Sequence, residues 1–70
     1  MARVLLDSES LRWVEYDPSS RVLKAEFRHG GEYHYFGVPP AVFRGLLAAE
    51  SRGAYFTHHV RNAYRTLKVR

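Results

Sequence analysis

Apolar and charged residues alternate along residues 22–28, which predicts a strand with one buried face. Three apolar residues alternate with three charged ones: Leu23, Ala25 and Phe27 with Lys24, Glu26 and Arg28. Similar segments lie on both sides of this strand, Leu11–Tyr16 before it and Glu32–Phe36 after it. Turn-forming residues, Asp17-Pro18-Ser19-Ser20 and Gly30-Gly31, separate the three segments. Short connections favour pairing between successive strands, so the sequence predicts a three-stranded antiparallel β-meander.

The hydrophobic spacing changes to that of helices after residue 40. Within Ala41–Glu50, Phe43, Leu46 and Leu47 lie three and four residues apart and form one apolar face. Ser51 follows, and its hydroxyl can accept a hydrogen bond from an amide in the first turn of a second helix. That helix is expected to begin at Arg52 and to end between residues 62 and 67. The prediction is an α+β fold in which the meander is followed by two α-helices packed on one face.

The second helix is expected to have an apolar face and a basic face. At 3.6 residues per turn, its apolar residues fall within an arc of roughly 100°. They are Phe56, Val60, Ala63, Tyr64 and Leu67. Four basic side chains cluster within roughly 80° on the opposite side. They are His58, Arg61, Arg65 and Lys68.

Basic residues are concentrated at the end of the chain, whose net charge is +4 at pH 7. Residues 1–50 contain six bases and seven acids, whereas residues 51–70 contain five bases and no acid. A solvated surface usually mixes both signs of charge, so this excess favours a polyanionic partner. The alternative is an ordinary helix face exposed to water.

Length and composition limit the class of protein. Seventy residues form one domain, 1–70, and the absence of cysteine excludes disulfides, cysteine-based zinc sites and a cysteine nucleophile. The apolar run Val4-Leu5-Leu6 is too short for a signal peptide or a membrane span. We therefore expect a cytoplasmic protein that does not enter a membrane.

No pattern of catalytic or metal-binding residues is present. His58 and His59 are adjacent and would point about 100° apart on a helix, so they cannot easily share one ion. His29 lies in a turn and His34 on a strand. The serines show no spacing typical of a catalytic triad, and Gly30-Gly31 does not precede a helix as a phosphate-binding loop does. We expect no enzyme activity, no metal and no cofactor.

Tyr33 and Tyr35 lie on the third strand, and the length of the preceding turn decides which face they occupy. A two-residue turn pairs Arg28 with Tyr33 and places both rings on the solvent face, where they can stack on bases. A three-residue turn pairs Phe27 with Tyr33 and places both rings in the core. The second register keeps the polar side chains of both strands together, so it is the favoured prediction.

Several of these residues together resemble the KTSC domain, a small family named for its occurrence at the C-terminus of some lysyl-tRNA synthetases. The resemblance spans about residues 7–64. Its most specific parts are the Tyr-x-Tyr of Tyr33 and Tyr35, and Ser-x-Gly-x-Tyr-Phe at residues 51–56. Family members often have proline where Arg65 stands here, which favours a longer second helix in this chain. The attachment to a tRNA synthetase implies, by analogy, that the domain binds RNA.

The sequence therefore predicts a non-catalytic module that contacts structured RNA through its basic helix. The residues expected to bind are Arg52, His58, Arg61, Arg65 and Lys68. Arg61 has an alternative role, an ion pair with Asp17 or Glu15 that would hold the helix to the sheet. A different class of function, protein interaction or self-association, also remains open. Trp13 is the reason for this alternative. It lies on the strand face opposite to that of Val14 and Tyr16, which predicts an exposed side chain, and exposed tryptophans are common interface anchors.

Overall fold

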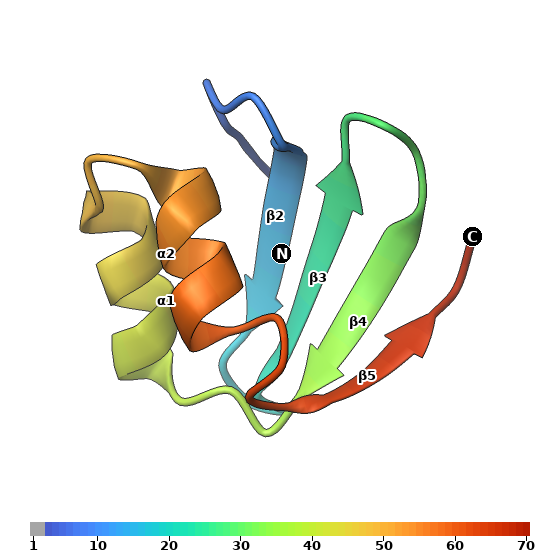
Figure 1. The fold of residues 1–70 in the computed structure, drawn as a ribbon. Coiled ribbons are helices and arrows are strands. Elements are labelled where there is room, and N and C mark those ends of the chain that lie inside the picture. The colour runs from blue at the N-terminus through green and yellow to red at the C-terminus, as the bar shows by residue number, and fades with distance from the viewer. Residues whose placement is uncertain (1–2) are drawn as a thin grey trace.

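The computed structural model describes residues 3–70, which form one five-stranded antiparallel sheet and two helices. The strands follow one another in space in chain order. They are β1 (Val4–Leu5), β2 (Leu11–Asp17), β3 (Val22–Phe27), β4 (Glu32–Phe36) and β5 (Arg65–Lys68). Helices α1 (Pro40–Ala48) and α2 (Arg52–His59) lie side by side on one face of the sheet (Figure 1). The α+β class and the position of both helices are as the sequence predicts.

The core lies between this sheet face and the helices. Leu11, Val14 and Leu23 from the sheet are fully buried together with Leu46 of α1 and Phe56 of α2. The ring of Tyr16 stacks on Phe43 of α1 at 4.8 Å, and the Tyr16 hydroxyl donates a hydrogen bond of 2.6 Å to the Val38 carbonyl. The aromatic packing holds α1 against β2, and the hydrogen bond links β2 to the segment that precedes α1.

Helix α2 begins at the predicted residue, Arg52, and α1 begins one residue before the predicted Ala41. Pro40 occupies the first turn of α1, where its missing amide hydrogen costs no helical hydrogen bond. The Ser51 hydroxyl accepts a hydrogen bond of 3.2 Å from the Ala54 amide, which confirms the predicted cap of α2. Helix α1 ends at Ala48, two residues before the expected end.

The number of strands and the end of α2 differ from the sequence prediction. Helix α2 stops at His59, where the amides of Val60 and Arg61 both donate to the Phe56 carbonyl. Residues 65–68 then form β5, which pairs with β4 instead of extending the helix. The predicted basic helix face is therefore wrong, because Arg65 and Lys68 lie on a strand. Their odd separation places them on opposite faces of the sheet.

The two tyrosines of β4 lie on the helix side of the sheet. Tyr33 pairs with Ala25 and Tyr35 with Leu23, so the register differs by two residues from the Phe27–Tyr33 pairing favoured from the sequence. A shift of two residues preserves the face on which each side chain lies. The predicted face is therefore confirmed, with Tyr35 buried and Tyr33 half-buried.

Trp13 lies on the opposite face of the sheet, as its position in β2 predicts, but it is not exposed. It pairs with Glu26, and only 3% of its surface is accessible. The Trp13 indole donates a hydrogen bond of 2.8 Å to the Glu26 carboxylate, and the Arg3 guanidinium lies 3.9 Å above the ring. The expectation of an exposed Trp13 was wrong because the side chains of Arg3, just before β1, and Glu26 of β3 cover it. No helix within residues 3–70 has the length and apolar character needed to cross a membrane.

Candidate functional site

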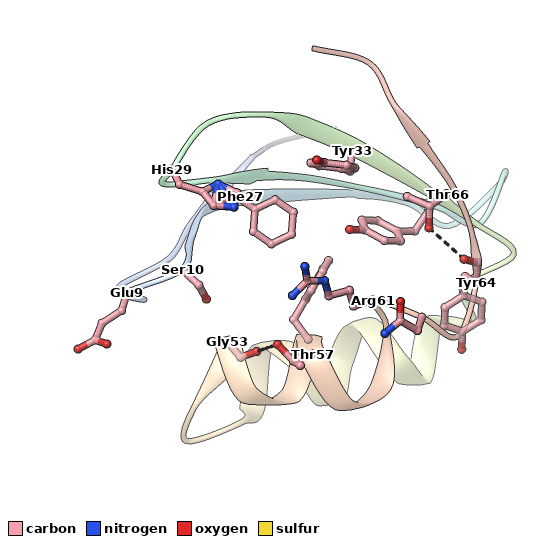
Figure 2. A pocket seen from close by; sticks show the side chains of 13 residues that line it. Glu9, Ser10, Phe27, His29, Tyr33, Gly53, Thr57, Arg61, Tyr64 and Thr66 are labelled. Carbon is pink, nitrogen blue, oxygen red and sulfur yellow. Dashed lines mark hydrogen bonds between the residues drawn. The ribbon is translucent and has the colours of Figure 1, made fainter.

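A cleft of about 640 Å³ lies between α2 and the part of the sheet formed by β3, β4 and β5. Figure 2 shows Gly53, Thr57 and Arg61 on the helix side of the cleft, with Phe27 and Tyr33 on the sheet side. Its lining also includes the turn after α2 and the segment before β2. The remaining lining residues are Glu9, Ser10, His29, Tyr35, Phe56, Asn62, Tyr64 and Thr66. The cleft therefore joins residues from distant parts of the chain.

Aromatic rings form the inner wall of this cleft. Phe27 meets Tyr33 edge-to-face at 5.4 Å and Phe56 at 5.6 Å, and Tyr35 meets Phe56 in the same geometry at 5.1 Å. The His29 ring lies 5.5 Å from Phe27 at one end. Edge-to-face pairs are the favoured arrangement of aromatic rings, so these contacts fix the wall in one conformation.

Arg61 is the cationic group in the lining of this cleft. Arg61 lies just after the end of α2, and its guanidinium extends into the cleft toward the sheet (Figure 2). Burial raises the pKa of Tyr35 to about 12, and the positive charge of Arg61 opposes that rise. Tyr35 is therefore a neutral hydroxyl at physiological pH. The arrangement can hold an anionic group at Arg61 while a flat apolar group contacts the rings.

The two threonines of the cleft present hydrogen-bond acceptors. The Thr57 hydroxyl donates its proton to the Gly53 carbonyl, and the Thr66 hydroxyl donates to the Tyr64 carbonyl, each at 3.0 Å. A hydroxyl that has used its proton in this way has only lone pairs left for a ligand. The lining thus offers donors at Arg61 and acceptors at both threonines.

Gly53 sets the distance between α2 and the segment before β2. A side chain at this position would place its Cβ 2.5 Å from the Ser10 hydroxyl and 3.3 Å from that of Ser8. A Cβ there would require the Ser10 side chain to rotate away, so glycine lets α2 approach this segment with the serine hydroxyls in their present positions. The glycine in the Ser-x-Gly-x-Tyr-Phe sequence thus has a direct structural reason, because it shapes one end of the cleft.

The structure separates the five basic residues predicted to bind. Arg52 donates a hydrogen bond of 2.9 Å to the Leu47 carbonyl, so it stabilises the end of α1. His58 is exposed on α2 and lines a second depression of about 510 Å³ beside the cleft. Arg61 lies in the cleft, whereas Arg65 and Lys68 lie on β5. Lys68 is on the Tyr33 side, with its ammonium 5.9 Å from that ring, and Arg65 lies 6.0 Å from Phe36.

The alternative role considered for Arg61, an ion pair with Asp17 or Glu15, does not occur. Glu15 instead pairs with Arg3 at 3.6 Å and with Lys24 at 3.8 Å on the far face of the sheet. The side chain and amide of Ser19 bind the Asp17 carboxylate and lower its pKa. Within the part of the chain that the structure describes, Arg61 has no carboxylate partner.

The described residues contain no cluster of side chains typical of a metal centre. Among residues 3–70, no three carboxylate or imidazole side chains come together in a way that would hold an ion. His34 is instead bound to Glu32, with 2.9 Å between the ring nitrogen and the carboxylate. His29, His58 and His59 are exposed at the surface.

Comparison with known proteins identifies the family. The family model for the KTSC domain matches residues 7–64, which is most of the sequence. The chain belongs to the KTSC family. A KTSC domain protein from Yersinia pestis has a crystal structure that superimposes with a TM-score of 0.94 at 29% identity, covering 99% of this chain and 97% of that one. The two proteins therefore share the same overall fold along nearly their whole length.

Relatives of this KTSC domain occur alone and within larger proteins. An uncharacterised protein of Stutzerimonas stutzeri is 48% identical over 56 residues, which are 80% of this chain and 79% of the relative. A lysine–tRNA ligase of Nostoc punctiforme is 31% identical over 55 residues, or 79% of this chain but only 10% of the ligase. The similarity thus covers a domain-sized part of that enzyme.

The residues that carry the family resemblance meet at the cleft. Tyr33 and Tyr35 come from the Tyr-x-Tyr sequence, Gly53 and Phe56 from the Ser-x-Gly-x-Tyr-Phe sequence, and Arg61 also lies within the matched residues 7–64. Sequence analysis treated these as separate features and did not place Phe27, His29, Thr57, Asn62 or Thr66 at a site. The two short sequences are the most specific parts of the family resemblance. That specificity was the only feature of the sequence that pointed to a common site.

Proposed function

We propose that this KTSC domain is a non-catalytic module that binds RNA at the cleft and along β5. The observation that carries the proposal is a group of three basic side chains that no acid neutralises. We call Arg61, Arg65 and Lys68 the basic rim. None of the three forms an ion pair with another residue in the range 3–70.

The other two basic residues of the C-terminal segment have structural roles. Arg52 binds the Leu47 carbonyl, and Arg70 pairs with the carboxylate of Glu32. Excluding them leaves three charges available to phosphates: Arg61 and Lys68 lie beside the wall of aromatic rings, and Arg65 lies on the other face of β5. Unneutralised cations beside exposed aromatic faces are typical of surfaces that bind single strands of nucleic acid.

The similarity to part of a lysine–tRNA ligase supports the same proposal, since that enzyme's name includes an RNA substrate. A relative of the same kind occurs in a second Nostoc strain, at 33% identity over 55 residues. A domain joined to such an enzyme would contribute to its function if the domain bound the RNA substrate. This argument is by analogy, whereas the basic rim is a property of this chain.

Binding of labelled RNA as a function of salt tests the proposal. Each phosphate contact releases condensed counterions, so three contacts give a slope of log affinity against log salt of about −2 to −3. Transfer RNA and a short RNA hairpin, measured by fluorescence anisotropy, suit the experiment. Replacing Arg65 and Lys68 together with alanine should weaken binding to both and reduce the slope by between about one and two.

The matched control removes the same charge elsewhere. Arg12→Ala with Arg44→Ala also deletes two exposed basic side chains, one from β2 and one from α1. This control should retain most of the affinity and slope of the parent. Equal loss in both double variants would mean that only net charge matters and would contradict a binding site at the rim. Absence of salt-dependent RNA binding, with a molecular mass that rises with concentration, would instead support a self-association module.

A further inference from the structure

We infer that the cleft binds one unpaired nucleotide of the RNA, with its base against Tyr33 and its phosphate at Arg61. This inference rests on the proposed function and names the part of the RNA that the site receives. The cleft volume of about 640 Å³ is within the range of pockets that enclose small organic molecules. A nucleotide projecting from a single strand or a loop is a ligand of that class.

The aromatic wall supplies the surface on which a base stacks. The Tyr33 ring lies along the sheet side of the cleft in Figure 2, and its contact with Phe27 at 5.4 Å keeps it in place. A ring that is already fixed loses little conformational freedom when a base stacks on it. Tyr33 is half-buried, so part of its surface remains available, whereas Tyr35 is buried to 2% exposure and mainly supports the wall.

Two cations lie where the phosphates on either side of such a base would pass. The Arg61 guanidinium extends into the cleft, and the Lys68 ammonium is 5.9 Å from the Tyr33 ring. Arginine can bind two phosphate oxygens at once through its planar fork, and lysine adds a point charge. The charges and the ring therefore lie within reach of a single nucleotide.

The geometry disfavours a base-paired strand. In an RNA duplex both faces of each base are covered by its neighbours, so stacking on Tyr33 requires a base that has left the helix. The acceptors at Thr57 and Thr66 can bind an N–H group, and every RNA base carries at least one. We therefore expect a strong preference for unpaired RNA with little preference among the four bases.

Nuclear magnetic resonance of the complete 70-residue chain tests where a nucleotide binds. The probes are adenosine 5′-monophosphate, adenosine and inorganic phosphate. Adenosine 5′-monophosphate should shift the amide resonances of residues that line the cleft, adenosine should shift them less at equal concentration, and phosphate least. Shifts scattered over the surface, or confined to residues outside the cleft, would overturn the inference.

A comparison of single-stranded and duplex RNA tests the role of Tyr33. Tyr33→Leu should weaken binding of a 12-nucleotide single strand at least about fivefold, the lower limit for loss of one base–aromatic stack. It should leave the affinity for the corresponding duplex unchanged. Tyr33→Phe is the matched control, because it keeps the ring and should retain the affinity of the parent. Equal affinity for single strand and duplex, or no effect of Tyr33→Leu, would exclude the stacked nucleotide while leaving RNA binding by the basic rim intact.

Arg61→Ala provides a test that does not depend on the folding of a Tyr33 variant, because Arg61 is exposed. In this variant adenosine 5′-monophosphate and adenosine should bind with equal affinity. A retained advantage of the monophosphate would show that its phosphate is bound elsewhere and would contradict the assignment. Failure of the proposed function is a different result, namely that no RNA binds in a salt-dependent way.

Discussion

Gly45 in α1 lies against the ring of Tyr55 in α2, so replacing it with alanine is not expected to stabilise the domain as it would in an ordinary helix. A Cβ at residue 45 would lie 2.8 Å from Cζ of Tyr55 and would also clash with its hydroxyl. The Tyr55 ring packs against the core and lies 4.4 Å from the His59 ring, so moving it away from residue 45 would disturb these contacts. This contact matters for the cleft because the packing of the two helices positions α2.

The expected magnitude follows from two opposing effects. In the interior of an exposed helix, replacement of glycine by alanine stabilises by about 1 kcal/mol. Overpacking a close contact costs about 1 to 3 kcal/mol. Gly45→Ala should therefore be neutral or destabilise the parent by up to about 2 kcal/mol, and the larger value lowers the melting temperature of a domain of this size by roughly 8 to 16 °C.

A double-mutant cycle with Tyr55→Ala isolates the contact. Without the tyrosine ring, Gly45→Ala should stabilise the domain by about 1 kcal/mol, as it does in an ordinary helix. The coupling free energy between the two positions should then be about 1 to 3 kcal/mol. Urea unfolding monitored by circular dichroism gives all four free energies. If Gly45→Ala stabilises the parent and the Tyr55→Ala variant equally, the close packing of the helices at this point is refuted.

Two further predictions concern the outer face of the sheet. The hydrogen bond from His34 lowers the pKa of Glu32 below its ordinary value of 4.5, burial opposes this change, and Arg70 adds to it. Because the folded pKa is the lower one, the stabilisation is present above pH 4.5 and is lost as the pH falls through the folded pKa. Glu32→Gln should therefore lose less of its urea midpoint between about pH 6 and pH 3 than the parent does, and an equal loss would count against this role. For Trp13, acrylamide should quench the fluorescence weakly in the parent and more strongly in Arg3→Ala; strong quenching of the parent monomer would contradict its burial.

The sheet and its orientation were predictable to the extent that local patterns determine them. The alternation in β3 fixed which face is buried, and the face of Tyr33 followed even though the actual register is shifted by two residues. The end of α2 was not predictable in the same way. Residues 56–67 have apolar residues at helical spacing, and among residues 65–70 only Thr66 and Val69 are of types that favour a strand. Pairing with β4 decides between the two structures, and that pairing is not visible in the local sequence.

The cleft depends still more on tertiary structure. Its lining joins β3, β4 and β5 to α2, so no local segment contains the site. The charge of the C-terminal segment did indicate candidate residues, but a prediction based on a longer helix placed Arg65 and Lys68 together on one face. Trp13 shows the same limit, since its face was correct but its cover by Arg3 depends on β1 pairing with β2.

Strand β5 is one of the two edge strands of the described sheet, and it is exposed along its whole length. The free backbone groups of such an edge can pair with another copy of the protein and start aggregation, and Leu67, at 55% exposure, adds an apolar contact. Arg65 and Lys68 oppose this, because two copies that meet edge to edge would bring like charges together. The protection depends on those charges remaining unneutralised. High salt or a bound polyanion would weaken this protection. Resistance to aggregation and ligand binding therefore depend on the same side chains.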